Sequence, residues 1–560
     1  MIWTGDSARH DNDEKIPRKV EEVLELNEYL VTKFAEVFGK RDRHNDTDPT
    51  NDFIIPVVPT FGNNDIMPHN IMEGGPNQWI KKFAHIWRSL IPEAQRHIFQ
   101  RGGYFFAEVI ANKLAVFNLN TLYFYESNGA VDGCGKKSEP GFAQMEWLRV
   151  QLQLIRERGM KAIIIGHVPP ARTYGKQSWD ETCWQKYSLW MRQYRDVVVG
   201  SLYGHMNIDH FMLQDFHQIK KKTKKGKLKT IDSLDEDISI QSKKEYLADL
   251  RDDWASIPDA PSSQEASMAK KKKHKRKKTY LEKIGGEWAE RYSVSLVSAS
   301  VVPNFFPSFR VVEYNISGLD HTSSSTASPV SEHSTGQYGG LEVNSLDQQP
   351  QGDAPRQSKK QADHNKKKKK PRYVVPLPPS KSSPPGPAYS PQTFTFLGYK
   401  QYMANLTRIN AAASALADSG SQTGIIADDL LRSNGFQYEL EYNTVNDSVY
   451  GMDDLTVRSW VDLARRIGRY VPNDEFTCED DDLEDYQLQE QQEESDEQNS
   501  VEAAKHKKHK KHKKHRKHKK KKKQSKKERE ETERLWFTFL RRAYVSTKGD
   551  EELREEFDGV

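Results

Sequence analysis

The sequence predicts an α/β protein whose core is built in layers. Short apolar runs alternate with stretches in which apolar residues recur every three to four positions, the patterns of strands and amphipathic helices respectively. Such alternation is typical of a sheet covered by helices. In addition, several of the short apolar runs end at a glycine that is followed by Asp, Asn or His.

These elements follow one another through the first 217 residues. Apolar residues between Val20 and Phe38 have helical spacing, whereas the apolar run at 53–61 is interrupted by proline. In chain order we expect a helix at 17–38, a strand at 53–61, two helices within 77–99, strands at 104–110 and 114–119, a helix at 141–158, a strand at 161–165, a helix at 184–194 and a strand at 196–202.

The composition changes after residue 217, where polar and charged segments separate the apolar ones. Strand patterns return at 291–302 and 309–316, and helical spacing returns at Leu455–Ile467. We therefore expect a core at 1–217, a basic and acidic disordered insertion at 218–284, core-completing strands at 285–318, a Ser/Pro/Lys-rich linker at 319–391, a C-terminal region at 392–475, an acidic and then Lys/His-rich disordered segment at 476–532 and an amphipathic segment at 533–560.

Bulk composition agrees with a globular part diluted by such segments. Hydrophobic residues make up 36% of the chain, below the roughly 45–50% of globular domains. The net charge of +5 hides lysine blocks at 220–229, 270–278, 366–370 and 505–527. Charge runs of this kind are usually solvated linkers. They lack the interleaved aromatic residues of RNA-binding surfaces, so no nucleic-acid partner is expected.

Cysteine usage and targeting signals leave the compartment open. Three cysteines, Cys134, Cys183 and Cys478, are too few for a disulfide scaffold and lack zinc-finger spacing. A Cys134–Cys183 pair and three free thiols are both consistent with the spacing. The chain has no signal peptide and no apolar run of membrane-spanning length. Glycosylation sequons occur at Asn45, Asn315, Asn405 and Asn446, and they matter only if the protein enters the secretory route.

The four glycine-ended runs predict one metal site. They deliver a carboxylate, an amide and two imidazoles, on Asp6, Asn63, His167 and His205. Oxygen and imidazole donors suit Mn, Fe, Zn or Mg, and two such ions about 4 Å apart can clamp a phosphoryl group. A single Gly-His or Gly-Asp pair is more often an ordinary turn. The recurrence at four strand ends favours a site.

The longer motifs around these residues resemble a known group of enzymes. They read WTGDSARHDND (3–13), FGNNDIMPHN (61–70), GHVPP (166–170), ETCWQKY (181–187) and GHMNIDHF (204–211). Their glycine pairs resemble the pattern of the calcineurin-like metallophosphoesterase superfamily, and the full motifs resemble the fungal endopolyphosphatase family. The resemblance covers most of 1–217 and resumes at 285–318, 392–470 and 536–547.

The resemblance implies a calcineurin-like layered β-sandwich flanked by helices. It also implies hydrolysis of internal phosphoanhydride bonds of inorganic polyphosphate by two divalent ions (Mn, Mg, Co, Zn or Fe) and a bridging hydroxide. Asp6 would bridge the ions, while Asn63, His167 and His205 would complete the shell of one. Asn207 stands where the superfamily has a histidine for the other ion, and His210 is its rival.

Further residues receive catalytic or substrate roles. His10, Asn64 and Asp65 are the catalytic candidates, with Asn64 at the position of a superfamily histidine that serves the leaving oxygen. Arg9, Arg172 and His210 are assigned to substrate phosphates, since the planar fork of arginine suits them. For His10 and Arg172, the sequence is equally consistent with solvated surface residues that have no catalytic or substrate role.

One departure from the superfamily pattern limits what we expect of this chain. The D-x-H motif is absent and the chain starts abruptly at the strand before Asp6, so we expect sequence to be missing upstream. One ion should then bind well and a second poorly, with slow hydrolysis. The alternatives are a sphingomyelinase-like phosphodiesterase and a catalytically impaired polyanion-binding protein. The resemblance also implies a vacuolar membrane protein with a lumenal catalytic domain and an anchor absent from this chain; homo-oligomerisation stays open.

Overall fold

The structure is a computed structural model, and it describes most of the chain outside its long polar segments. The described residues are 1–10, 15–40, 53–173, 175–226, 242–260, 270–301, 304–319, 373–380, 382–418, 436–472 and 526–557. Asn45, Cys478 and the lysine blocks at 366–370 and 505–525, for which predictions were made from the sequence, lie outside the described residues.

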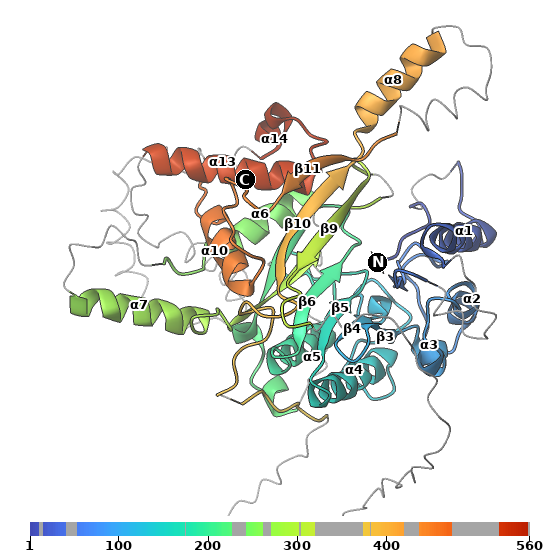
Figure 1. Cartoon of the computed structure of the whole chain (residues 1–560), viewed down its shortest axis with the longest axis horizontal. Helices are drawn as coiled ribbons and strands as arrows, with labels where there is room; N and C mark the ends of the chain where they lie inside the picture. The colour runs from blue at the N-terminus through green and yellow to red at the C-terminus, as the bar shows by residue number, and fades with distance from the viewer. Residues whose placement is uncertain are drawn as a thin grey trace, which may run out of the picture.

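A six-stranded mixed sheet forms the centre of the molecule (Figure 1). Its strands, in spatial order, are β3 (Phe105–Ile110), β4 (Leu114–Asn118), β5 (Lys161–Ile165), β6 (Val198–Tyr203), β8 (Tyr292–Val297) and β7 (His210–Asp215). The four inner strands are parallel, and β3 and β7 pair antiparallel at the edges. Both β4 and β5 are buried almost throughout, which explains their uninterrupted apolar sequences.

Two helices connect the parallel strands. α4 (Pro140–Glu157) precedes β5 and α5 (Glu181–Gln193) precedes β6. Right-handed crossovers place both on one face of the sheet, where Figure 1 shows them side by side. A disulfide joins Cys134 to Cys183 at the start of α5, which decides between the two states that the cysteine spacing had left open.

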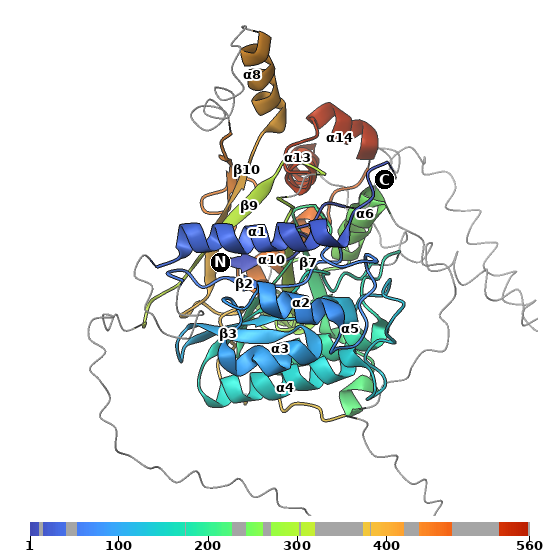
Figure 2. The ribbon, with the colours of Figure 1, turned by 90° about the vertical axis from the view of Figure 1, so that its right-hand side faces the viewer.

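The N-terminal part builds a layer of its own beside the sheet (Figure 2). β1 (Ile2–Trp3) and β2 (Val58–Pro59) form a short parallel pair, and α1 (Val20–Phe38), α2 (Gln78–Ile86) and α3 (Arg96–Gly102) follow in chain order. The strand expected at 53–61 is reduced to β2 because prolines interrupt the run and cannot donate to a ladder. The ring of Phe61 packs 4.8 Å from Phe83, between these helices and the sheet.

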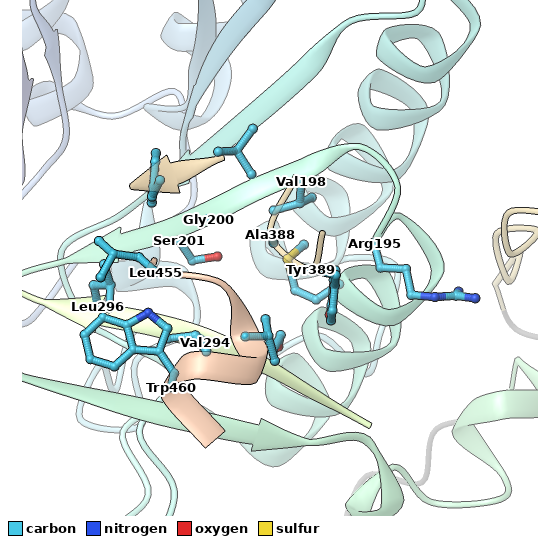
Figure 3. A pocket seen from close by; sticks show the side chains of 15 residues that line it. Arg195, Val198, Gly200, Ser201, Val294, Leu296, Ala388, Tyr389, Leu455 and Trp460 are labelled. Atoms are coloured by element: carbon cyan, nitrogen blue, oxygen red, sulfur yellow. The ribbon is translucent and has the colours of Figure 1, made fainter. Parts of the chain in front are cut away.

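A second, three-stranded antiparallel sheet has the order β11-β10-β9. Its strands are β9 (Ser308–Tyr314), β10 (Phe396–Met403) and β11 (Glu439–Asn443). The two sheets meet at Gly200 of β6, where a Cβ would lie 2.7 Å from the ring of Phe396. Figure 3 shows the apolar junction around Gly200, Leu296 and Trp460, which encloses a cavity of about 30 Å³. That volume admits water and no substrate.

Some of the remaining helices cover β7 and the far edge of the large sheet, and one, at Leu406–Asp418, projects away from both sheets (Figure 1). These remaining helices are α6 (Lys243–Trp254), α7 (Lys270–Ile284), α8 (Leu406–Asp418), α10 (Val457–Ile467), α13 (Lys526–Ala543) and α14 (Asp550–Phe557); single 3-10 turns occur at Glu93–Gln95, Thr121–Tyr123, Phe216–Gln218 and Thr223–Lys225. The ring of Phe211 in β7 packs against Trp254 at 4.6 Å, Trp460 at 4.5 Å and Phe539 at 6.2 Å. This contact joins α6, α10 and α13 to one strand.

Within the insertion expected to be disordered at 218–284, the structure corrects that expectation for Ser242–Trp254. α6 is a capped helix with a capping box of Ser242 and Glu245, and its Tyr246, Leu247, Leu250 and Trp254 are buried. These apolar residues have helical spacing but stand among charges that hid them in the segment's composition. Likewise, residues 373–380 and 382–391 of the expected linker contact the core, where the Tyr389 hydroxyl donates to Tyr292 O at 2.9 Å.

The mixed α/β class predicted from the sequence is confirmed. In the part of the chain that the structure describes, no helix is both long enough and apolar enough to cross a membrane.

Candidate metal centre

The four predicted ligand segments follow the carboxyl ends of parallel strands. His167 comes directly after β5 and Gly166, and His205 comes after β6 and Gly204. The amide of Gly204 donates to His167 O at 3.0 Å, which holds the two histidine turns together. Asp6 and Asn63 follow β1 and β2, the second parallel pair. Ligands are expected at this edge because parallel strands end there together.

Two glycines let the Asp6 and Asn63 turns touch backbone to backbone. A Cβ on Gly62 would lie 2.1 Å from the nitrogen of Asp6, and a Cβ on Gly5 would lie 2.4 Å from the nitrogen of Gly62. Gly5 also has a φ of +82°, which favours glycine. The glycine that precedes each ligand is therefore required by close packing.

The structure gathers the predicted donors into one cluster. One donor atom each from Asp6, His167 and His205 lies within 4.8 Å of the others. Asn63 Oδ1 lies 2.8 Å from His167 Nε2 and 2.9 Å from His205 Nδ1. The other amide atom of Asn63 donates to Asn70 Oδ1 at 2.9 Å, which turns the Asn63 oxygen toward the cluster.

Hydrogen bonds and burial prepare these donors to bind a cation. His167 Nδ1 donates to Thr4 O at 2.6 Å, so Nε2 faces Asp6 Oδ2 at 3.2 Å. Burial lowers the pKa of His205 to about 3, which keeps its imidazole neutral and able to ligate. Burial alone would raise the pKa of Asp6, but His167 and hydrogen bonds from Asn64 hold it below its usual range. The residues therefore fit a divalent cation.

The backbone at the cluster is strained. Asp6, His205 and Asn207 have φ values of 59°, 70° and 56°, in the left-handed region that side chains with a Cβ rarely adopt. Such conformations persist where the surrounding structure fixes them, and they concentrate at functional sites. Their presence at three predicted ligand positions supports a functional centre.

The structure gives Asp65 and Asn64 supporting positions. The Asp65 carboxylate is fully buried and accepts hydrogen bonds from the backbone nitrogens of Asp6, Ser7, Ala8 and Gly62 and from Asn27 Nδ2. With those bonds made, it anchors the Asp6 turn, and its assignment as a catalytic group stays a prediction. Asn64 donates to both oxygens of Asp6, from its backbone nitrogen at 2.8 Å and from Nδ2 at 2.9 Å. It thus orients the Asp6 carboxylate.

His10 and Asn207 meet at one side of the cluster. Asn207 Nδ2 lies 3.2 Å from His10 Nε2. Burial lowers the pKa of His10. His210 is different: it is buried at the start of β7, with Nδ1 3.1 Å from Ile208 O and Nε2 3.1 Å from Tyr246 Oη. Both nitrogens have partners within the protein, and the assignments of His210 to substrate and to the second ion stay predictions.

Both arginines predicted for substrate are engaged elsewhere. Arg9 Nε lies 2.9 Å from Glu22 Oε1 on α1, and Arg9 Nη2 donates to Ile16 O at 2.6 Å. Arg172 Nη1 lies 2.9 Å from Glu181 Oε2, and its guanidinium lies 4.4 Å above the Trp184 ring. These contacts fix the guanidinium groups on neighbouring elements, and the assignment of both arginines to substrate stays a prediction.

Sequence reasoning missed several residues that complete the centre. Thr4 acts through its backbone carbonyl, which every residue has, so the residue type gives no indication of this role. Asn70 acts through a side-chain hydrogen bond to Asn63 that the sequence does not predict. Arg18 is buried and donates to Asn64 O at 2.5 Å, and the Tyr125 ring packs 5.2 Å from His205. Asn70 lies inside the 61–70 motif, which was the one available clue.

The sequons that the structure describes lie around the three-stranded sheet. Asn446 is exposed in the loop after β11. Asn315 and Asn405 are partly buried, and their side-chain oxygens accept from the amides of Ser317 at 2.8 Å and Arg408 at 3.0 Å. Glycosylation at these positions stays a prediction.

Comparison with known proteins identifies relatives over most of the chain. No protein-family model matches it. The chain is 46% identical to the endopolyphosphatase of Neurospora crassa over 84% of its own length and 68% of that protein. It is 32% identical to the endopolyphosphatase of Yarrowia lipolytica and 34% identical to that of Saccharomyces cerevisiae, covering 75% and 73% of them. At this identity and coverage, the chain belongs to the endopolyphosphatase family.

Proposed function

We propose that this protein hydrolyses internal phosphoanhydride bonds of inorganic polyphosphate with the help of divalent metal ions. The observation that carries the proposal is the convergence of Asp6, Asn63, His167 and His205 at the carboxyl ends of parallel strands. The relatives named endopolyphosphatase supply the substrate class. We further propose that the two sheets and their helices form a calcineurin-like architecture.

The residues of the centre divide the work of binding and orientation. The family resemblance implies two divalent ions. When bound at this centre, such ions would withdraw electron density from phosphorus and lower the pKa of water. Asp6 is held ionised and oriented by Asn64, while His205 is kept neutral by burial. The Thr4 carbonyl fixes the ring of His167. The set is thus preorganised for cations and for the negative charge of a phosphoryl group.

The leaving group of this reaction makes modest demands on the protein. A phosphate leaving an anhydride is weakly basic, so a strong general acid is not required. The imidazole of His10 beside Asn207 is placed to donate a hydrogen bond to substrate oxygens.

We also propose that the protein works in an oxidising compartment of the secretory route, the vacuolar lumen. The Cys134–Cys183 disulfide supports this, because disulfides rarely persist in the cytosol. The exposed sequon at Asn446 is consistent with passage through that route.

The experiment is a product-length analysis of long-chain polyphosphate incubated with the purified protein, with and without a chelator. We expect fragments of intermediate length, their loss on chelation, and recovery when Mn²⁺, Mg²⁺, Co²⁺ or Zn²⁺ is restored. A phosphodiester substrate run in parallel should not be cleaved. Metal-dependent binding of polyphosphate without any shortening would overturn the proposal in favour of a non-catalytic polyanion-binding protein.

A further inference from the structure

The loop after β4 lies at the same edge of the large sheet as the two histidine turns. β4, β5 and β6 are parallel neighbours, so the loops that follow them meet at the carboxyl ends of the strands. The loops after β5 and β6 supply His167 and His205, whereas the β4 loop, residues 120–128, contains none of the predicted ligands. Three of its polar side chains are nevertheless buried: Asn120, Thr121 and Asn128. Buried polar groups need partners, and these lead to the metal centre.

Thr121 holds the backbone of the turn that contains His167. Its hydroxyl oxygen accepts hydrogen bonds from the backbone nitrogens of His167 at 3.2 Å and Val168 at 2.9 Å. These nitrogens lie beyond the last residue of β5, and buried backbone donors require an acceptor. One hydroxyl has two lone pairs and can accept both bonds. The packing is also close, because a Cβ on Gly166 would lie 2.5 Å from Thr121 Cγ2.

Tyr125, in the same loop, packs against the imidazole of His205. The centroids of the two rings are 5.2 Å apart and their planes meet at 76°, an edge-to-face contact. The ring of His167 contacts the same imidazole at 5.1 Å and 74°. Rotation of the His205 side chain would bring its ring into collision with one of these two rings. The contact with Tyr125 therefore restricts the direction in which the His205 nitrogens point.

The β4 loop is itself fixed at both ends. Asn120 N donates to Gln144 Oε1 on α4 at 2.8 Å, and Gln144 Nε2 donates to Asn120 O at 2.9 Å. At the other end, Asn128 Nδ2 donates to Met72 O at 2.9 Å, and Asn128 Oδ1 accepts from Met72 N at 3.2 Å. Paired bonds of this kind hold a loop in one conformation, so Thr121 and Tyr125 have defined positions.

A further connection returns from Tyr125 to the His167 turn. Tyr125 forms an isolated antiparallel bridge with Trp179. The indole Nε1 of Trp179 donates to Val168 O at 2.9 Å. The β4 loop and the two histidine turns are therefore one connected unit, in which movement of the loop would displace both imidazoles.

We propose that Thr121 and Tyr125 are positioning residues of the metal centre, Thr121 for His167 and Tyr125 for His205. The inference rests on the proposed function, because it requires the two imidazoles to bind metal. Residues that orient metal ligands typically change metal affinity by about 10–100-fold when they are replaced. Loss of either contact should therefore weaken metal binding and alter the arrangement of the ligands, beyond any effect on folding.

The test uses two variants that each remove one contact and two that keep it. Thr121→Val removes the accepting hydroxyl, and Tyr125→Leu removes the ring. Thr121→Ser retains the hydroxyl, and Tyr125→Phe retains the ring.

The three-stranded sheet offers a matched control for each residue. Thr444 is buried, and its hydroxyl accepts from Tyr399 N at 2.9 Å, so Thr444→Val removes the same kind of bond as Thr121→Val. Tyr402 is partly buried with its ring 5.2 Å from that of Phe309, so Tyr402→Leu removes a ring contact of the same length as Tyr125→Leu does. Neither control residue contacts the histidine turns.

The measurement is a Co²⁺ titration of chelator-treated protein. Calorimetry gives Kd, and the visible absorption of bound Co²⁺ reports the geometry of its ligands. Thermal unfolding of the metal-free variants gives their stability separately, so that a loss of folded protein is not mistaken for a loss of affinity.

We expect Kd for Co²⁺ to rise about tenfold or more in Thr121→Val and in Tyr125→Leu, with a changed absorption spectrum. In Thr121→Ser, Tyr125→Phe and both controls, Kd should change less than about twofold and the spectrum should stay the same. An unchanged Kd and spectrum in a folded variant overturns the role of that residue, and an equal rise in its control does so too. If one variant does not fold, the other decides by the same criteria.

The two proposals fail separately. Co²⁺ binding that depends on Thr121 and Tyr125 in a protein that never shortens polyphosphate would remove the proposed function and leave the positioning residues standing. Metal-dependent shortening of polyphosphate with unchanged Co²⁺ binding in Thr121→Val and Tyr125→Leu would do the reverse.

Discussion

The backbone nitrogen of Asp6 donates a hydrogen bond to the buried carboxylate of Asp65, with 2.8 Å between Asp6 N and Asp65 Oδ2. The same oxygen accepts from Gly62 N at 2.9 Å, so one side chain ties together the two turns that hold Asp6 and Asn63. This hydrogen bond explains how Asp6, whose φ lies in the left-handed region, is held in position close to the first residue of the chain. Assembly of the centre therefore depends on the Asp65 carboxylate.

Replacing Asp65 by Asn should disrupt this anchor. The amide offers one acceptor in place of two, and its NH₂ group would face backbone donors, so we expect a loss of about 2–4 kcal/mol in the free energy of unfolding. Denaturant unfolding and calorimetric metal titration should both register the change, with weaker metal binding in the folded fraction. The control is Asp453→Asn at an exposed position. Unchanged stability together with lost catalysis would instead make Asp65 a catalytic group.

A second anchor lies at the other end of the ligand turn. Arg310 in β9 forms a buried ion pair with Asp209, whose other oxygen accepts from the Tyr442 hydroxyl at 2.5 Å. We predict that Arg310→Met destabilises the protein by about 3–5 kcal/mol, because it leaves the Asp209 charge buried and without its cation. Thermal unfolding measures the effect.

The double variant Arg310→Met/Asp209→Asn gives the control for this pair. It removes both charges and should recover part of the loss. A double variant less stable than Arg310→Met would contradict the assignment of the loss to an uncompensated carboxylate.

The sequence predicted those residues of the centre that can be recognised by their type and by their position at the end of a strand. Asp6, Asn63, His167 and His205 follow glycine-ended runs, and the helical spacing from Val20 to Phe38 matches α1. Residues 210–215 were not recognised as a strand, because β7 forms through pairing with β8, some eighty residues later in the chain. Helix α6 was missed because its apolar residues stand among charges.

Roles that depend on a side chain's contacts were beyond the sequence. Arg9 and His210 carry suitable groups, but Glu22 engages the first and Ile208 and Tyr246 engage the second. Residue type fixes what a side chain can do, whereas tertiary packing fixes which partner it meets.

Lys186 gives a prediction about pH. It is fully buried on α5, with its ammonium 3.4 Å from the ring centroid of Phe142 and 4.8 Å from that of Tyr373. Burial lowers its pKa from 10.5 to about 7. Below pH 7 both the folded and the unfolded chain hold the proton, and the folded state bears the full cost of a buried cation. Between pH 7 and 10.5 the unfolded chain binds more protons, so stability from this group rises with pH.

Lys186→Met should remove that dependence. At pH 6 we expect the variant to be more stable by about 2–4 kcal/mol, and the difference should shrink by pH 9. Denaturant unfolding at several pH values makes the measurement. A variant that is less stable than the unmodified protein at pH 6 would mean that the two aromatic rings compensate the buried charge.

The disulfide should contribute strongly to stability. Cys134 and Cys183 are 49 residues apart, and closing a loop of this length is worth about 2–4 kcal/mol. Cys134→Ser/Cys183→Ser should lower Tm by several degrees, and reduction of the unmodified protein should match it. Cys478→Ser serves as the control that leaves the disulfide in place. Equal melting of oxidised and reduced protein would contradict the prediction.

The central claim is that His205 and its neighbours bind the metal on which polyphosphate cleavage depends. The most direct measurement is the rate of internal bond cleavage in long-chain polyphosphate as a function of divalent-metal concentration, for the unmodified protein and for His205→Ala. We predict saturable activation by metal in the unmodified protein and a rate at least about 100-fold lower in the folded variant, with metal binding lost in parallel. Cleavage that persists in His205→Ala, or that ignores chelation, would contradict the account.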